Sequence, residues 1–322
     1  MSETATAAAA AASETIAQPA RPGGSLVASV TSRLVIAIPY VWLALFFLAP
    51  FLIVFKISFS TSAIAMPPYT PVFDGIAGFW DNVSEFTTDN YAFLLDDALY
   101  RNAYIESVII AAVSTVLALL IGFPIAYGMA RAPMSLRPTL MMLVILPFWT
   151  SFLIRVYAWI GILKPEGLLN QFLLATGIID TPLQIMNTHV AIFIGIVYSY
   201  LPFMILPLYS TLEKMDHSLI EAAQDLGCTP LAAFWKVTFP LALPGIVAGC
   251  LLVFIPATGE FVIPDLLGGS QTLMIGKTLW TEFSANRDWP LSSAVAVILL
   301  LLLVLPIVWF QNAQAKAQEA GR

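Results

Sequence analysis

Charged residues are scarce in this chain. Only 11% of its 322 residues are Asp, Glu, Lys or Arg, whereas about a quarter is usual in soluble globular domains. Hydrophobic residues make up 59% of the sequence. This balance excludes an ordinary soluble domain, because so few polar side chains cannot cover its surface. The sequence therefore predicts an integral membrane protein.

Residues for common catalytic, metal and nucleic-acid sites are also scarce. The chain has two cysteines and two histidines, too far apart for a metal site. Cys228 lies in a loop and Cys250 in an apolar run, so we expect free thiols rather than a disulfide. The net charge of -6 is unlike that of a nucleic-acid-binding protein. There is no G-x-x-x-x-G-K-[ST] sequence, catalytic triad or paired-acid site, so we expect no enzyme activity and no bound cofactor.

Long apolar runs, in contrast, are abundant. A helix that spans a bilayer needs about 20 mostly apolar residues, and six stretches of the chain qualify. Prolines recur inside them, which predicts bent helices. The predicted spans are residues 34–57, 104–130, 139–163, 189–208, 241–263 and 291–310.

The flanking charges predict the orientation of these spans. Cytoplasmic segments of membrane proteins carry an excess of Lys and Arg. With the N-terminus inside, eight such residues fall on the cytoplasmic side and five on the other. We expect residues 1–33 to be a disordered cytoplasmic tail rather than a signal peptide, 34–312 to be the membrane domain, and 313–322 to be a cytoplasmic tail. The eight are Arg21, Arg33, Arg131, Arg137, Lys214, Lys236, Lys316 and Arg322, and the five are Lys56, Arg101, Lys164, Lys277 and Arg287.

A polar hairpin is predicted between the fourth and fifth apolar runs. Asp216 or Ser218 can cap its first helix, and Ser218 with Glu221 has the spacing of a capping box. Gly227 suits a left-handed helix stop. Thr229-Pro230 then offers an N-cap followed by proline at the first helical position. A capped surface helix without a partner would also explain this local pattern.

The full spacing of the hairpin, E-A-A-x3-G-x9-hydrophobic-x-hydrophobic-Pro, resembles the EAA loop of the membrane subunits of bacterial ATP-binding-cassette (ABC) importers. Val237 and Phe239 stand where that family more often has Ile and Leu. In the family, this loop forms a coupling helix that sits in a groove of a cytoplasmic ATPase. The resemblance implies that the EAA loop, residues 213–240, couples to such an ATPase through Glu221, Ala222, Ala223, Asp225, Gly227 and Pro240.

Four other stretches resemble polyamine permeases of this importer class: residues 146–159, 259–269, 274–276 and 286–290. The resemblance extends over about 34–310, and residues 67–70 favour the putrescine-importing members. It implies an all-α membrane protein with six transmembrane helices, of the MetI-like type I importer architecture, in the bacterial inner membrane. The implied partners are the lipid bilayer, a second permease subunit, an ATPase dimer that binds ATP and magnesium, and a periplasmic polyamine-binding protein.

Polar residues at membrane depth are candidates for the cargo path, since a charge at a helix centre costs about 2.5–3.5 kcal/mol on insertion scales. Glu260 either pairs with Arg155 as a structural ion pair or faces a water-filled path. The segment 66–104 carries six acids and one arginine, which attracts cations and repels anions such as sulfate or molybdate. Aromatic faces can hold an ammonium group. The candidate path residues are Glu260, Asp265, Trp149, Arg155, Tyr157, Trp159, Tyr198 and Tyr200.

These observations predict the permease subunit of an ATP-driven polyamine importer, with putrescine as cargo. Spermidine or another small cation is an alternative cargo. A cation channel or uniporter without an ATPase would use the same acids and aromatics, but it would leave the EAA loop unexplained. A membrane scaffold would explain that loop as a docking site, but not the carboxylate at membrane depth.

Overall fold

The computed structural model describes residues 26–72, 83–270 and 272–320. It divides into two compact units, one ending at Val54 and the other beginning at Phe55, and each is described by itself. Residues 1–25 of the predicted N-terminal tail lie outside the described residues, and the chain is helical from Leu26. At the other end, helix continues through most of the predicted tail, as far as Ala320.

The first unit is a single helical path. α2 (Leu26–Leu43) continues through the π-helical turn η1 (Ala44–Leu48) into α3 (Ala49–Ile57), which passes into the second unit. Val35–Ile57 is long and apolar enough to cross a membrane, with a mean hydropathy of 2.3. None of the described side chains between Val35 and Val54 is buried. This helix therefore presents an apolar surface suited to lipid or to another subunit.

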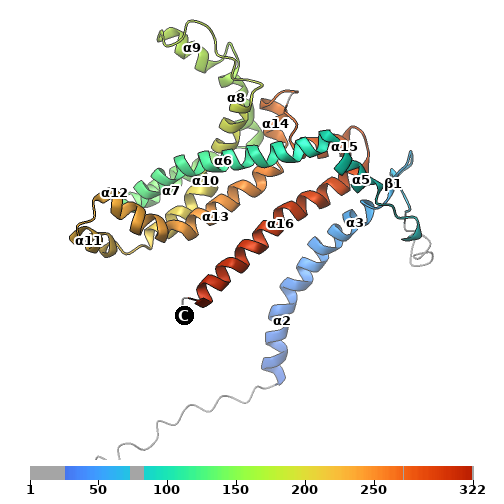
Figure 1. The fold of residues 1–322 in the computed structure, drawn as a ribbon, viewed down its shortest axis with the longest axis horizontal. Coiled ribbons are helices and arrows are strands. Elements are labelled where there is room, and N and C mark those ends of the chain that lie inside the picture. Colours follow the sequence, from blue (N-terminus) through green and yellow to red (C-terminus); the bar gives the residue numbers. More distant parts are fainter. Residues whose placement is uncertain (1–25, 73–82, 271, 321–322) are drawn as a thin grey trace, which may run out of the picture. The chain divides into compact units, whose positions relative to one another are not determined.

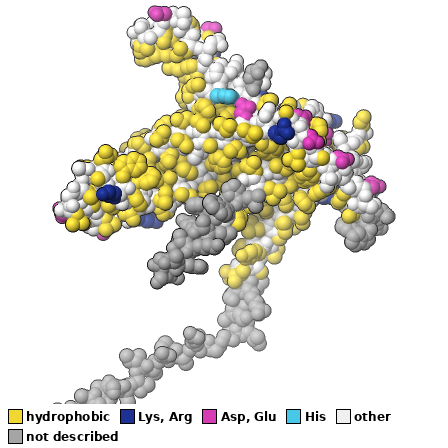
Figure 2. Space-filling view, viewed as in Figure 1, with side chains coloured by type: hydrophobic (Ala, Val, Ile, Leu, Met, Phe, Trp, Pro, Cys, Tyr) yellow, Lys and Arg dark blue, Asp and Glu magenta, His cyan; other side chains and the backbone are white. Residues whose placement is uncertain are grey.

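Three long helices form the core of the second unit (Figure 1): α6 (Ala98–Arg131), α10 (His189–Glu213) and α13 (Phe239–Thr258). Small residues let them approach closely, as is usual between membrane helices. A Cβ atom added at Gly249 would lie 2.7 Å from the sulfur of Met204. Hydrophobic side chains cover the visible face of the bundle, while charged ones gather toward its ends (Figure 2). The fully buried core includes Ala118, Ala126, Met204, Leu208 and Val253.

The third apolar run, predicted as one bent span over 139–163, is broken into separate helices. The run forms α7 (Arg137–Ile145), the 3-10 turn η2 (Leu146–Trp149), α8 (Phe152–Leu163) and then α9 (Leu168–Ala175). The two arms meet at 88°. Thr150 has extended backbone angles, with φ -97° and ψ 152°, and Pro147 removes a helical N–H donor just before it.

The fifth run is also divided. α11 (Ser218–Asp225) precedes α12 (Pro230–Ala233), which continues through the π-helical turn η3 (Phe234–Thr238) into α13. α13 ends at Thr258, and a separate short helix, α14 (Val262–Leu267), follows. The predicted end at residue 263 therefore lies beyond the break. A turn with Gly269 at φ +70° then leads to α15 (Ile275–Ser284).

Figure 1 shows the remaining short elements at the end of the bundle opposite α11 and α12. Strands β1 (Thr61–Ser62) and β2 (Tyr69–Thr70) pair antiparallel, and α5 (Asp89–Asp96) leads into α6. The last helix is α16 (Trp289–Ala320). The Tyr100 hydroxyl donates to Glu282 Oε1 at 2.8 Å, and the Tyr104 hydroxyl donates to the Val295 carbonyl at 2.8 Å. These bonds tie α6 to α15 and α16.

The helical fold class is confirmed, but the number of six crossings is not. Among the described residues, four helices are long and apolar enough to cross a bilayer, and the bent third run makes a fifth if its arms form one span. The sixth predicted span, residues 291–310, lies within the helix α16 (Trp289–Ala320).

Candidate functional site

The first candidate site is the EAA loop, whose start differs in detail from the prediction. α11 begins at Ser218 itself, with His217 in the N-cap position. Ser218 is therefore one residue too late to cap the helix, and the predicted capping box with Glu221 does not form. Asp216 Oδ1 instead accepts a hydrogen bond from the Ser218 N–H at 2.9 Å. This bond, with a further one from the Ser218 hydroxyl, lowers the pKa of Asp216.

The turn of the EAA loop follows the prediction. Gly227 has φ +86°, its N–H bonds to the Gln224 carbonyl at 2.8 Å, and the Cys228 N–H bonds to the Ala223 carbonyl at 3.0 Å. These two bonds make a Schellman motif, which favours glycine at the left-handed position. The Thr229 hydroxyl then accepts from the Ala232 N–H at 3.3 Å, with Pro230 at the first helical position.

The outward surface of the EAA loop combines acids with large apolar side chains. Leu226, at the turn, is 87% exposed. Leu231 in α12 and Trp235 in η3 are also exposed, as are Glu221 and Asp225. Exposure of these apolar side chains to water is unfavourable. Such a combination is typical of a surface that another protein covers.

The second candidate site lies at the break between α13 and α14. Glu260 is only 8% exposed. Its carboxylate accepts a hydrogen bond from the Tyr200 hydroxyl of α10 and another from the Val262 N–H at 3.0 Å. It thus satisfies the first free N–H groups of α14, where the helix dipole also favours an anion. The break in the fifth run places this carboxylate between two helices.

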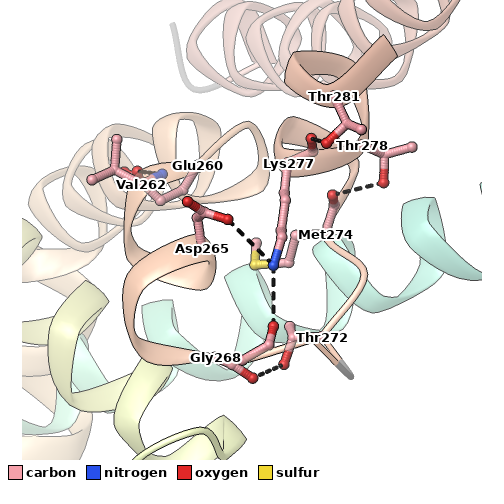
Figure 3. A network of polar contacts seen from close by, with 10 residues as sticks. Glu260, Val262, Asp265, Gly268, Thr272, Met274, Lys277, Thr278 and Thr281 are labelled. Atoms are coloured by element: carbon pink, nitrogen blue, oxygen red, sulfur yellow. Dashed lines mark hydrogen bonds and ion pairs between the residues drawn. The ribbon is translucent and has the colours of Figure 1, made fainter. Parts of the chain in front are cut away.

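A second carboxylate lies one turn further along (Figure 3). The Asp265 side chain is 57% exposed, and its Oδ1 lies 3.4 Å from the Lys277 ammonium of α15. The same ammonium donates to the Gly269 carbonyl at 3.1 Å. The break therefore holds two acids of different character: Glu260 is buried and bound by a phenol, whereas Asp265 is accessible and bound by a cation.

Arg155 does not pair with Glu260. The Arg155 guanidinium instead lies over the rings of Phe148 at 4.9 Å and Phe152 at 5.9 Å. The residue is 9% exposed, and its Nε and Nη1 atoms are buried without a hydrogen-bond partner. The structural ion pair is therefore not present within this chain.

The other predicted path residues do not converge on one point. Tyr200 reaches Glu260, whereas Trp159 and Tyr198 pack edge to face with ring centroids 5.3 Å apart. Trp149 is 75% exposed and Tyr157 is also exposed. The structure thus brings Tyr200 to the carboxylate and leaves Trp149 and Tyr157 on the outside of the chain.

Sequence reasoning missed two residues around the break. Lys277 was counted only for orientation, although it is the cation that follows the two carboxylates most closely in the sequence. Gly276 was noted only as part of a resemblance. A Cβ atom there would collide with the carbonyl oxygens of Gly259 and Glu260. The small residue therefore lets α15 pack directly against the broken backbone.

Residues 116–319, which contain both candidate sites, match the family of binding-protein-dependent transport system inner membrane components. The chain belongs to this family. The resemblance to importer permeases is thereby confirmed, and the chain is a multi-pass membrane transport component rather than an enzyme.

Individual relatives cover most of the chain. It is 42% identical over 281 residues to the spermidine/putrescine transport system permease protein PotB of Haemophilus influenzae, covering 87% of this chain and 93% of that protein. PotB of Escherichia coli is 43% identical over 272 residues, covering 84% and 94%. The molybdenum transport system permease protein ModB of Mycobacterium bovis is 32% identical over 212 residues, covering 65% and 76%.

Solved structures show the same fold. A bacterial ABC transporter involved in the import of alginate superposes with a TM-score of 0.63 at 14% identity, covering 89% of this chain and 95% of the other. At that identity the likeness shows the fold alone. It confirms the importer-permease architecture of the helices described above.

Proposed function

We propose that this chain is a membrane subunit of an ATP-driven polyamine importer, with putrescine as its principal cargo. The observation that carries the cargo assignment is the buried Glu260 carboxylate, in a chain 42% and 43% identical to relatives named for spermidine and putrescine transport. A second acid, Asp265, lies nearby on α14. Two carboxylates suit the two ammonium groups of putrescine.

The cargo path passes the break between α13 and α14. Asp265 is accessible and meets the cargo first, while Glu260 lies deeper beside Tyr200. The Tyr200 ring adds an aromatic face that favours a cation over an anion. The described acids of the segment 83–104, Glu85, Asp89, Asp96 and Asp97, raise the local cation concentration.

The EAA loop and both termini face the cytoplasm in this proposal. The exposed Leu226, Leu231 and Trp235 dock on a separate ATPase dimer, which binds ATP and magnesium. A second permease subunit completes the path, and a periplasmic binding protein delivers cargo to the opposite end. An alginate importer has been solved in complex with its periplasmic protein, which provides a precedent within the fold.

Coupling follows from the continuity of the helix that joins the two sites. Pro230–Thr258 is one helix of 29 residues, or about 43 Å at 1.5 Å per residue. Its residues 230–240 belong to the EAA loop, and its last residue precedes Gly259 and Glu260. When ATP binding closes the ATPase dimer, movement of the hairpin is transmitted along this helix to the break, which opens outward. Hydrolysis returns it inward.

Proteoliposomes test this function. We expect labelled putrescine uptake only when the second permease, the ATPase, ATP and the binding protein are all present. The membrane potential alone favours cation entry by about 2.3 kcal/mol per charge per 100 mV, so a channel or uniporter would show uptake without the ATPase. A scaffold would show none with every partner present. Unlabelled spermidine, cadaverine and molybdate as competitors rank the cargoes, and we expect molybdate to have no effect.

A further inference from the structure

The proposed function assigns no role to Arg155, the buried cation of α8. Arg155 lies in the first turn of this helix, just after the extended residues that break the third run. It is about nine-tenths buried, and its Nε and Nη1 atoms have no hydrogen-bond partner in the described ranges 26–72, 83–270 and 272–320. A guanidinium normally binds acceptors through several of its five N–H groups.

Within the part of the chain that the structure describes, this charge is poorly compensated. The Phe148 ring at 4.9 Å and the Phe152 ring at 5.9 Å give cation–π contacts, but ring faces do not replace the hydrogen bonds lost on burial. An uncompensated buried charge is among the most unfavourable features a protein can contain. An acceptor from outside this chain is therefore expected.

The nearby carboxylates of the chain already have partners. Glu260 accepts from Tyr200 and from the backbone of α14. Asp265 pairs with Lys277, and Glu106 lies 2.9 Å from His189. None of these acids forms an ion pair with Arg155 among the described residues, although α8 packs against both α14 and α10.

The surface beside Arg155 has the character of a protein interface. Trp149 is 75% exposed, and Ile154 and Tyr157 on α8 are also exposed. The bend of 88° turns α8 and α9 away from the direction of α7 (Figure 1). Large aromatic residues around an arginine are the composition that interface centres favour.

We propose that Arg155 and the apolar surface of Trp149, Ile154 and Tyr157 form part of the interface with the second membrane subunit, which supplies a carboxylate to the guanidinium. This inference depends on the proposed function, because it requires a second membrane subunit. A carboxylate matches the planar fork of Arg by two parallel hydrogen bonds. Cationic cargo is repelled by Arg155, so the residue does not serve as a cargo ligand.

Co-purification tests the interface. Tagged chain is expressed with the second membrane subunit and the ATPase, as wild type and as Arg155→Met, Arg155→Lys and Arg101→Met. Arg101 is the matched control because it is exposed at the start of α6. We expect Arg155→Met to lower the retained second subunit about tenfold or more, Arg155→Lys to give an intermediate loss, and Arg101→Met to match wild type.

The thermal stability of the isolated chain separates an interface role from an internal one. Removal of an unpaired buried charge is expected to leave the melting temperature of Arg155→Met equal to or above that of wild type. A lower melting temperature would assign Arg155 to the chain's own packing and overturn the proposal. Wild-type retention of the second subunit by Arg155→Met would also overturn it. If wild type itself retains no second subunit, the proposed function fails instead.

Photocrosslinking identifies the occupant directly. Benzoylphenylalanine replaces Trp149, which leaves Arg155 in place, and we expect crosslinks to the second membrane subunit. Crosslinks mainly to phospholipid, or to another copy of this chain, would overturn the proposal. Arg155→Glu is then combined with single Asp or Glu to Arg substitutions in the second subunit. Restored co-purification in one pair names the acid, and failure of every pair contradicts a carboxylate partner.

Discussion

At the residue scale, the two acids near the break between α13 and α14 differ in burial and in binding partner. Glu260 is held by Tyr200 and the α14 backbone, while Asp265 is accessible and paired with Lys277. The acids themselves were predictable, because charges are rare in apolar runs. Their partners were not, since Lys277 and Tyr200 come from other helices. For the same reason the sequence did not show that Arg155 lacks an ion pair with Glu260. The Glu260 carboxylate is bound by Tyr200 and the α14 backbone instead.

Glu260→Gln tests the deeper acid. Glutamine keeps one acceptor oxygen for the Val262 N–H, so helix α14 retains its cap, while its NH2 group replaces the oxygen that accepts from the Tyr200 hydroxyl. The negative charge is lost, and with it a charged hydrogen-bond partner contributing about 1.5 kcal/mol. We expect the KM for putrescine uptake to rise about tenfold, with normal assembly. The matched control is Asp180→Asn, an exposed acid after α9. Loss of assembly in Glu260→Gln would make the residue structural.

Lys277→Met tests competition at the accessible acid. The Lys277 ammonium forms an ion pair with the Asp265 carboxylate and so competes with a cationic cargo for it. Removal of the ammonium therefore leaves the carboxylate free to bind cargo. Exposed ion pairs contribute up to about 1 kcal/mol, and we expect the KM for putrescine to fall about threefold. Lys164→Met, an exposed lysine after α8, serves as the control. An unchanged KM together with a lower melting temperature would show that the pair only holds α14 against α15.

At the element scale, the sequence was most informative where structure depends on neighbouring residues alone. The stop at Gly227 and the cap at Thr229 follow from backbone sterics and short hydrogen bonds, so both predictions were confirmed. The capping box at Ser218 was wrong by one position, because Asp216 supplies a competing acceptor. The break at Thr150 was not placed, because proline is tolerated within intact membrane helices.

Gly227→Ala tests the turn of the EAA loop. Nothing lies within 4 Å of an added Cβ atom there, but φ is +86°. The expected effect is therefore backbone strain without a clash, about 1 kcal/mol. Amide hydrogen exchange in residues 218–226 should become about fivefold faster in the isolated chain, with unchanged exchange in α6. Gly128→Ala is the control, because Gly128 lies in the last turn of helix α6 with open space around it. Equal exchange in the two variants would contradict the strain at Gly227.

At the scale of the whole molecule, one helix connects the two candidate sites. The composition and the apolar runs predicted a membrane protein and a helical fold, and the family match confirms the importer class. The number of crossings could not be fixed from the runs, because the third is broken into two arms that count as one crossing only if they form one span. The fifth run is also broken, at Gly259, although Pro230–Thr258 before the break is long enough to cross by itself. The same breaks place Glu260 and Arg155 where contacts between helices decide their roles.

Leu226→Asp and Glu221→Ala test whether the EAA loop drives that helix. Leu226 is exposed at the turn, so a charge there leaves the fold intact but disfavours an apolar docking groove. We expect each variant to insert into the membrane and to retain the second membrane subunit. Each should lose about 90% or more of its co-purified ATPase and of its uptake, because exposed anchors dominate such interfaces. Ile178→Asp controls for added charge, since Ile178 is exposed outside the loop. If the variants retain the ATPase but lose uptake, the loop acts by transmitting movement along the helix Pro230–Thr258 rather than by docking. If both variants behave like wild type, the ATPase does not couple through this surface.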